Sequence, residues 1–266
     1  MSNHVDLTPT VLCIGGLDPC GGAGLTADAR ACAAFGALCL PIATAIVVQN
    51  TRGVKKIEPI APNIVAAQIE TLLEDIQPAA IKIGLIATLS SVEGLASLLR
   101  PLHNLAPIVL DTVFAPSTGQ AFNDNSTIEA IRGQLLPLAT VVTPNALEAR
   151  QLGTGEISDL NDMARGAIAI HERTGAHNVL MKGGHAGNAQ FAIDLFFDGT
   201  RFLELRAERE NSYEVRGTGC LLASALAAGL AKGKTAPDAA TDAKTWLTEQ
   251  YLSARAIGHG RRIAAI

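Results

Sequence analysis

The chain has 266 residues, of which 48% are hydrophobic and 17% charged, so it can bury the core of one large α/β domain or two small ones. Aromatic residues make up only 4%, which favours helices packed closely on a sheet over an aromatic-rich β-sandwich. The net charge is −4 without a block of basic residues, and no apolar run reaches the roughly 18 residues of a membrane span. We therefore expect neither nucleic acid nor a membrane as a partner.

The five cysteines are odd in number and form no C-x-x-C pair. The N-terminal stretch MSNHVDLTPT has neither the basic nor the apolar region of a signal peptide. Both features are typical of a cytoplasmic protein with free thiols. Of the five, we expect Cys13, Cys20, Cys32 and Cys39 to be small apolar fillers, and we expect no structural zinc site.

Strand-like and helix-like segments alternate along the chain. In order, the pattern predicts a strand over 10–16, a helix over 25–36, strands over 38–50 and 53–60, a helix over 62–76, a strand over 79–86, a helix over 90–102, a strand over 106–113, a strand and helix over 139–153, a helix over 160–175, a strand over 177–184, a hairpin over 191–208, and helices over 217–233 and 236–256. This alternation predicts a mostly parallel sheet covered by helices on both faces.

We see no linker and no repeat, so we expect a single domain over residues 1–266. The Asp198-Gly199 pair predicts a hairpin that adds antiparallel edge strands. In such sheets ligands bind outside the carboxyl ends of the strands. The residues that follow strands are Gly16, Gln49, Gly84, Asp111, Asn145 and Lys182.

Two carboxylates follow buried strands. Asp111 ends one strand, and Glu148 lies in TPNALE, three residues after Asn145 on the same face of a first helical turn. Mg²⁺ is usually held by one or two carboxylates together with waters and substrate phosphates. Asp111 and Glu148 fit that requirement, although Glu148 alone can equally serve the helix dipole.

A lysine and a glycine-rich turn supply positive charge. Lys182 ends the strand HNVLM, where a lysine is costly unless it contacts an anion or opens to a cleft; the alternative is a side chain that reaches the surface. In GTGC, Gly217 and Gly219 precede an Ala/Leu-rich helix, so backbone N–H groups and the helix N-terminus make an anion site. We expect a lowered pKa for Cys220 there, which suits a base or a nucleophile, the alternative being an inert thiol.

Two further glycine motifs are weaker. GGAG over 21–24 lacks the spacing of a dinucleotide fingerprint and fits an ordinary strand-to-helix turn about as well as a ligand contact. AAGLAKGKT has the wrong spacing for a P-loop and ends a helix instead of following a strand. We interpret the latter as a helix end with solvated lysines.

The motifs GGLDPCGGAGLTAD, QNTRGV, KIGL, LDTV, TPNALEA, MKGGH and GTGC occur in the order and spacing of the hydroxymethylpyrimidine/phosphomethylpyrimidine kinases. The resemblance covers about Val11 to Gly260. It implies the ribokinase-like three-layer α/β sandwich, with a mostly parallel central sheet between helices, and a homodimer. Sugar kinases of the same superfamily usually carry Asp at the position of Cys220.

The resemblance implies ATP-dependent phosphorylation of 4-amino-5-hydroxymethyl-2-methylpyrimidine, and then of its monophosphate, in thiamine biosynthesis. By similarity, Cys220 is the catalytic base and Lys182 assists phosphoryl transfer. The implied substrate-binding residues are Gly16, Asp28, Val47, Gln49 and Leu85, with Asp28 and Gln49 bonding the aminopyrimidine. The implied ATP-binding residues are Thr143, Asn145, Lys182, Gly217, Thr218 and Gly219, and Asp111 and Glu148 would place Mg²⁺.

The chain departs from the family pattern HGTGCT at two positions. Arg216 replaces His, which adds a cation that either assists the phosphate or occupies other space. Leu221 replaces Thr, which removes a hydroxyl close to the nucleotide phosphates. Pro116 stands where the family often has a polar or basic residue, and IGHG is followed by Arg-Arg-Ile in place of a Gly-Pro-containing end.

Two other functions stay open. A pyridoxal or pyridoxine kinase would also act on a ring that carries a hydroxymethyl group. A non-catalytic pyrimidine sensor would explain the altered RGTGCL turn. The joint presence of Asp111, Glu148, Lys182 and Cys220 argues against a sensor, because a sensor has no need of a complete phosphoryl-transfer set.

Overall fold

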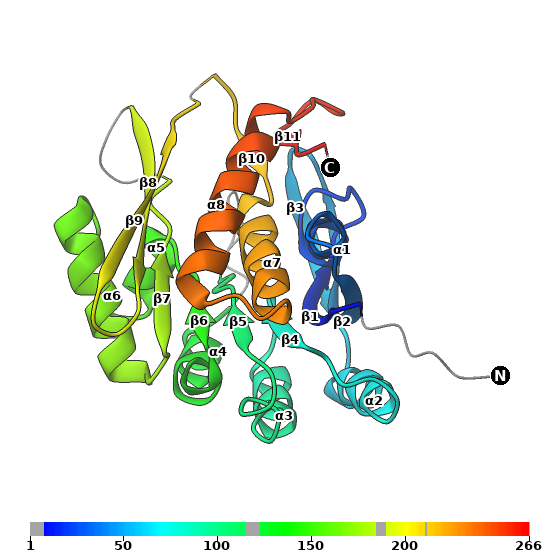
Figure 1. Ribbon diagram of the computed structural model, residues 1–266. Coiled ribbons are helices and arrows are strands. Elements are labelled where there is room, and N and C mark those ends of the chain that lie inside the picture. The colour runs from blue at the N-terminus through cyan, green and yellow to red at the C-terminus, as the bar shows by residue number, and fades with distance from the viewer. Residues whose placement is uncertain (1–7, 115–122, 185–189, 211, 266) are drawn as a thin grey trace.

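A computed structural model describes residues 8–114, 123–184, 190–210 and 212–265 (Figure 1). Pro116 and His185 lie outside these residues. The strands of the main sheet are β1 (Thr10–Leu17), β2 (Leu38–Asn50), β3 (Gly53–Pro59), β4 (Ala80–Ile83), β5 (Ile108–Leu110), β6 (Val141–Val142), β7 (Asn178–Met181), β8 (Phe191–Phe197) and β9 (Phe202–Glu208). The helices are α1 (Gly24–Ala34), α2 (Pro62–Leu73), α3 (Leu89–Leu99), α4 (Asn125–Ala130), α5 (Ala146–Gln151), α6 (Leu160–Thr174), α7 (Thr218–Ala231) and α8 (Ala236–Leu252).

The nine strands lie in the order β3-β2-β1-β4-β5-β6-β7-β8-β9. Strands β2, β1, β4, β5, β6 and β7 are parallel. At the edges, β3 pairs antiparallel with β2, β8 pairs antiparallel with β7, and β9 pairs antiparallel with β8. The predicted hairpin at Asp198-Gly199 is confirmed, since β8 pairs with β9 in register from Phe191 to Phe197. The chain leaves β1 toward β2 and later returns to its other side as β4. The carboxyl ends of β1 and β4 are therefore the topological switch point, where such folds bind ligands.

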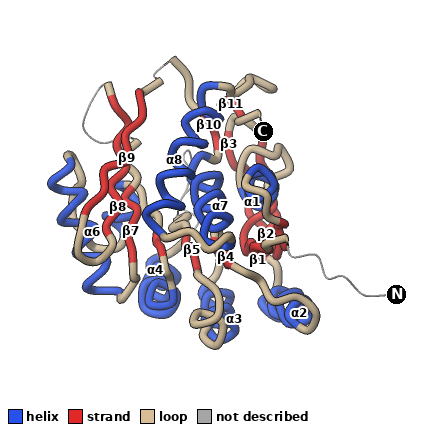
Figure 2. Tube along the Cα trace, in the orientation of Figure 1, coloured by secondary structure: helices blue, strands red, loops and turns tan. Residues whose placement is uncertain are grey.

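Helices cover both faces of the sheet, which confirms the expected three layers (Figures 1 and 2). One apolar core lies between the sheet and α2, α3, α4 and α6, and a second lies between the sheet and α1, α7 and α8. Six of the ten buried residues of α7 are small (four alanines, Ser224 and Gly229), which allows this helix to pack closely on the strands and on α8. In the described part of the chain, no helix combines the length and the hydrophobicity needed to cross a bilayer.

Several local features differ from the sequence-based expectation. The helix predicted over 90–102 is α3, and its N-cap is Thr88, whose side chain accepts a hydrogen bond from the Ser91 N–H. The sequence pattern predicted no element in the region that forms α4, a π-helical turn over Ile131–Leu135 and a 3-10 turn over Leu136–Leu138. It also missed a small parallel pair of strands, β10 (Val215–Arg216) and β11 (Arg262–Ile263). These two strands are two residues long, too short for any periodicity to show.

The segment that resembles a P-loop forms a connection between two helices, as interpreted from the sequence. Lys232 is the C-cap of α7, and Gly233 follows in a left-handed conformation with φ +79°. Thr235 then caps α8 by accepting from the Asp238 N–H, and Lys234 pairs with Asp242 at the surface.

Candidate active site

Two helix N-termini meet over the carboxyl ends of the central strands. Gly24 begins α1 with φ +55°, and a Cβ at this position would collide with the carbonyl oxygen of Gly16 on β1. Gly217 precedes α7 with φ +76°, and a Cβ there would collide with the carbonyl oxygen of Gly22. Glycine is thus required at both positions by conformation and by space. The close approach brings the positive ends of two helix dipoles together.

Lys182, Asp111 and Glu148 form a buried cluster at the ends of β7 and β5 and the start of α5. Lys182 Nζ lies 2.9 Å from Asp111 Oδ1 and 3.5 Å from Glu148 Oε2. The three residues predicted from separate strand ends are therefore brought together. The Lys182 side chain is 14% exposed, so the cluster is accessible from one side.

Two threonines hold the carboxylates in place. The Thr143 hydroxyl donates to Asp111 Oδ1 at 3.1 Å, and the Thr112 hydroxyl donates to Glu148 Oε2 at 3.0 Å. Thr143 is fully buried, so in this structure its hydroxyl serves Asp111, and its predicted phosphate contact stays a prediction. Thr112 was not identified from the sequence.

Asn145 and Glu148 form a capping box at the start of α5. Asn145 Oδ1 accepts from the Glu148 N–H at 2.9 Å, and Glu148 Oε2 accepts from the Asn145 N–H at 2.8 Å. Glu148 therefore satisfies the helix start, as in the alternative explanation, and also faces Lys182. The side-chain oxygen of Asn145 accepts the capping hydrogen bond. The predicted contact of Asn145 with ATP stays a prediction.

Burial and mutual charge set the protonation of the cluster. Burial opposes ionisation of Asp111, but the ammonium groups of Lys182 and Lys82 outweigh it and keep the pKa of Asp111 below its usual value. Burial, reinforced by the charge of Asp111, raises the pKa of Glu148. The two carboxylates raise the pKa of Lys182 despite its burial. The lysine is thus a fixed cation at the cluster.

The N-terminus of α7 lies directly against this cluster. A Cβ on Gly219 would lie 3.2 Å from Lys182 Nζ and 3.6 Å from Asp111 Oδ2. The lysine, the carboxylates and the first turn of α7 consequently border one space. This arrangement agrees with the anion site that the GTGC motif predicted.

Cys220 lies in the first turn of α7 and is partly exposed. Burial of its thiol, together with the charges of Asp111 and Asp28, raises the pKa of Cys220 to about 12, although Lys82 and the Gly24 N–H favour the thiolate. The expectation of a lowered pKa is therefore wrong for the protein without ligands. Removal of the thiol from water and two nearby carboxylates outweigh the helix N-terminus.

A small apolar wall lies at the ends of β1 and β2. A Cβ on Gly16 would lie 3.0 Å from both Leu85 Cδ2 and Val47 Cγ2, so these three predicted substrate-binding residues are in contact. Val47 and Leu85 belong to one apolar group with Ala45, Val54, Ile57 and Val113. Gln49 is half-buried and lies two residues after Val47, on the same face of β2.

Asp28 forms a closed ion pair with Lys82, a residue that was not predicted from the sequence to belong to the site. Lys82, on β4, lies 2.8 Å from Asp28 Oδ1, and the Ser224 hydroxyl donates to the same oxygen at 2.7 Å. Both charged side chains are essentially inaccessible, and Asp28 Oδ2 has no hydrogen-bond partner among the described residues. The sequence signal that could have identified Lys82 is a lysine inside an otherwise apolar strand. Only Asp28 Oδ2 remains for the predicted bond to an aminopyrimidine.

The two departures from the family motif have structural roles here. Arg216 is buried, with Nε 3.5 Å from Asp18 Oδ2 and Nη1 donating to the Asn50 carbonyl at 3.3 Å. It therefore occupies other space, one of the two alternatives considered. Leu221 is 1% exposed and packs in an apolar cluster with Ala27 and Ala31 of α1. Its side chain lies in the core, and the expected loss of a hydroxyl close to the nucleotide phosphates stays a prediction.

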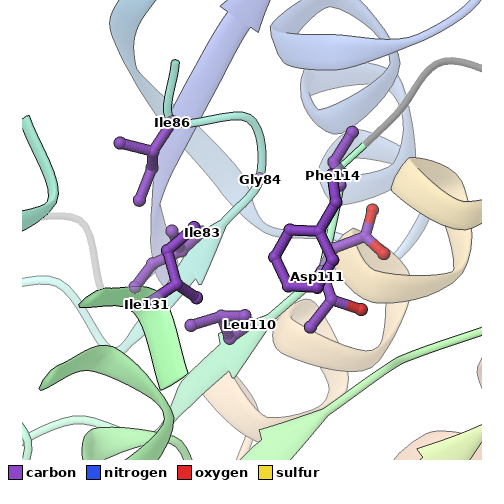
Figure 3. Close-up of a pocket in the computed structure, with 9 residues that line it drawn as sticks. Ile83, Gly84, Ile86, Leu110, Asp111, Phe114 and Ile131 are labelled. Carbon is purple, nitrogen blue, oxygen red and sulfur yellow. The ribbon is translucent and has the colours of Figure 1, made fainter. Parts of the chain in front are cut away.

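An apolar pocket lies beneath Asp111, between β4 and β5. It is lined by Ile83, Gly84, Ile86, Leu110, Asp111, Thr112, Val113, Phe114 and Ile131. Figure 3 shows Ile83, Leu110 and Ile131 on one side, with Phe114 and Asp111 opposite them. This lining accounts for the strong desolvation of Asp111, because apolar side chains back the carboxylate.

The donor set fits a magnesium ion. Asp111 Oδ1 and Glu148 Oε2 carry the contacts described above, which leaves Asp111 Oδ2 and Glu148 Oε1 for a ligand. Oxygen ligands from two carboxylates, completed by water and phosphate, are the environment that Mg²⁺ prefers. The positively charged Lys182 adjoins both carboxylates. A bound phosphate would supply negative charge that balances Lys182 and the metal.

Comparison with known proteins agrees with this geometry. The family model described as phosphomethylpyrimidine kinase matches residues 18–264. The hydroxymethylpyrimidine/phosphomethylpyrimidine kinase of Rhizobium meliloti is 41% identical over 96% of this chain and 96% of its own length. The phosphomethylpyrimidine kinase structure from Clostridium difficile is 32% identical, with a TM-score of 0.79 over 91% of this chain and 98% of that one. The ADP complex of pyridoxal kinase from Bacillus subtilis is 30% identical, with a TM-score of 0.88 over 97% of both chains. With these matches over nearly its whole length, the chain belongs to the phosphomethylpyrimidine kinase family.

Proposed function

We propose that this kinase transfers the terminal phosphoryl group of ATP to the hydroxymethyl group of 4-amino-5-hydroxymethyl-2-methylpyrimidine, and then to the resulting monophosphate, in thiamine biosynthesis. The observation that carries the proposal is the convergence of Lys182, two carboxylates and the start of α7 beside Cys220 and the Gly16–Val47–Leu85 contact. Phosphoryl transfer needs positioning and charge stabilisation above all, and these groups supply both.

On the nucleotide side, Lys182 and the N–H groups at the start of α7 would bind the phosphates. Lys182 carries its charge in the free protein because the carboxylates raise its pKa. Asp111 and Glu148 would hold Mg²⁺, which neutralises phosphate charge when bound. Thr143 and Thr112 keep these carboxylates oriented through the hydrogen bonds described above.

On the acceptor side, Gly16, Val47 and Leu85 would pack against the flat ring, and Gln49 would bond its polar edge. Cys220 would accept the proton of the attacking hydroxyl on its sulfur. The thiolate is the form that accepts a proton, and the Gly24 N–H and Lys82 are the groups that stabilise it. Because the pKa of the resting thiol is high, we expect activity to rise toward alkaline pH.

The proposal is tested by mass spectrometry of the products formed from the pyrimidine and Mg-ATP. The expected result is the monophosphate followed by the diphosphate, with ADP released at each step. Folded protein that forms neither product would contradict the proposal. Calorimetric binding of the pyrimidine without any product would favour the sensor instead.

Pyridoxal phosphorylation is the second candidate, because the Bacillus subtilis pyridoxal kinase structure is similar over 97% of the chain. Both rings carry a hydroxymethyl group, so the same wall and base can serve either. Competing the two substrates and comparing kcat/KM decides between them. We expect the pyrimidine to be preferred, since the family model and the Rhizobium meliloti relative carry that name.

We also propose that the protein is a homodimer. Leu38, Ile46 and Val48 of β2 are exposed apolar side chains, which supports an interface there. Light scattering during size-exclusion chromatography should give twice the chain mass of 27.6 kDa. A single chain mass at micromolar concentration would contradict this expectation.

A further inference from the structure

Three of the cysteines expected to be fillers meet at one point. Cys13 lies on β1, Cys32 on α1 and Cys39 on β2, and their sulfur atoms all lie within 4.8 Å of one another. The sulfurs of Cys13 and Cys32 are 3.9 Å apart. All three are free thiols. Two parallel strands and the helix that connects them create this cluster, so it could not be seen as a spacing motif.

The separations match the size of a metal–thiolate centre. With metal–sulfur bonds of about 2.3 Å, three sulfurs in a plane around one ion lie about 4.0 Å apart. The distance between Cys13 and Cys32 agrees with that value. Among the described residues, no histidine or carboxylate joins the group at this range. A set of three sulfurs without a fourth ligand favours an ion of low coordination number over four-coordinate Zn²⁺.

The surroundings favour a soft cation with a low charge. Cys13 and Cys32 lie in the apolar core beneath α1, and Cys39 packs against it while remaining half-buried. Thiolate ligands select Cu(I) among the metals of low coordination number.

We propose that Cys13, Cys32 and Cys39 form a binding site for one Cu(I) ion. Each thiol that binds as thiolate releases its proton to solvent, and no electron is transferred. The site lies behind the kinase site, because Cys32 is one helical turn after Asp28 on α1.

The test is an anaerobic titration of the reduced full-length protein with Cu(I) in competition with a chromophoric Cu(I) chelator. The expected result is transfer of one equivalent of Cu(I) from the chelator, with new ultraviolet absorption from sulfur-to-copper charge transfer. Cys39→Ala should lose this uptake. Cys39 is the variant of choice because its partial exposure makes misfolding least expected, and its thermal unfolding midpoint without metal checks the fold.

Cys20→Ala is the matched control, since Cys20 is also half-buried but lies outside the cluster. It should retain the full equivalent and the absorption band. The proposal is overturned if the wild-type protein takes no Cu(I) from the chelator, or if Cys39→Ala retains uptake. Equal losses in Cys39→Ala and Cys20→Ala, or uptake of Zn²⁺ in place of Cu(I), would overturn it as well.

Discussion

Two buried lysines lie at the same edge of the sheet, and they differ in what surrounds them. Lys82 pairs with one carboxylate, Asp28, and both side chains are inaccessible. Lys182 pairs with two carboxylates, Asp111 and Glu148, and is 14% exposed beside the first turn of α7. The charge of Lys82 is matched within the fold, whereas the cluster at Lys182 leaves carboxylate oxygens and a cation open to a ligand.

The comparison shows how the same residue type acquires different functions. The closed Lys82–Asp28 pair joins β4 to α1, and the hydrogen bond from Ser224 joins α7 to the same carboxylate. Together these contacts fix the positions of both helices on the sheet. The cluster at Lys182 is exposed on one side, where a phosphate or a metal can replace the contacts within the cluster. Variants that separate stability from activity therefore test the difference.

The largest effect is expected for Cys220→Ala, at the point where the two regions meet. The charges of both Lys82 and Asp111 act on the pKa of its thiol, in opposite directions. Removal of the base should lower kcat by about 10²- to 10⁴-fold and leave substrate binding largely intact. Steady-state kinetics and calorimetry check this, and the alkaline rise in rate should disappear. An unchanged kcat would make Cys220 a structural part of the helix start.

Lys82→Met should lower stability, and it also removes a charge that favours the Cys220 thiolate. It leaves the Asp28 carboxylate buried without its counter-charge, which typically costs about 3–5 kcal/mol of the free energy of unfolding. Urea denaturation monitored by circular dichroism measures the loss. The double variant Lys82→Met with Asp28→Leu should recover much of it, because no charge is then stranded. A double variant as unstable as the single one would refute the closed-pair interpretation.

Lys182→Met should mainly lower activity. Removal of one preorganised cation from phosphoryl transfer is expected to lower kcat by about 10²- to 10³-fold. The loss of stability should be smaller than for Lys82→Met, since the cluster at Lys182 is accessible to solvent from one side and the Lys82–Asp28 pair is not. Kinetics and urea denaturation of both lysine variants under the same conditions give the comparison. Equal stability losses would remove the distinction between the open and closed regions.

The smallest effect is expected for Arg216→Met. This side chain donates one hydrogen bond, to the Asn50 carbonyl, and its contact with Asp18 is long at 3.5 Å. Asp18 keeps the N–H groups of Cys20 and Ala23 as partners. Loss of one net hydrogen bond should cost about 1 kcal/mol of unfolding free energy. A kcat loss as large as that of Lys182→Met would instead place Arg216 at the phosphates.

Local patterns predicted the scaffold and the positions of most site residues. Apolar runs alternating with helical spacings predicted the parallel sheet, and strand ends predicted that Asp111, Glu148 and Lys182 would lie together. The same patterns failed for the region of α4 and the turns after it, where short helical segments of different types follow one another. They also failed for Lys82, because a charged residue in a strand says nothing of its partner.

The sequence by itself determined where strands end and where glycine is needed, because both follow from short-range periodicity and backbone sterics. Only the tertiary structure decided which charges meet. Lys82 and Asp28 are 54 residues apart, and Lys182 and Asp111 are 71 apart, so each pair depends on the strand order. The same holds for the pKa of Cys220 and for the three thiols at Cys13, since burial and neighbouring charge exist only once β1, α1 and α7 have packed.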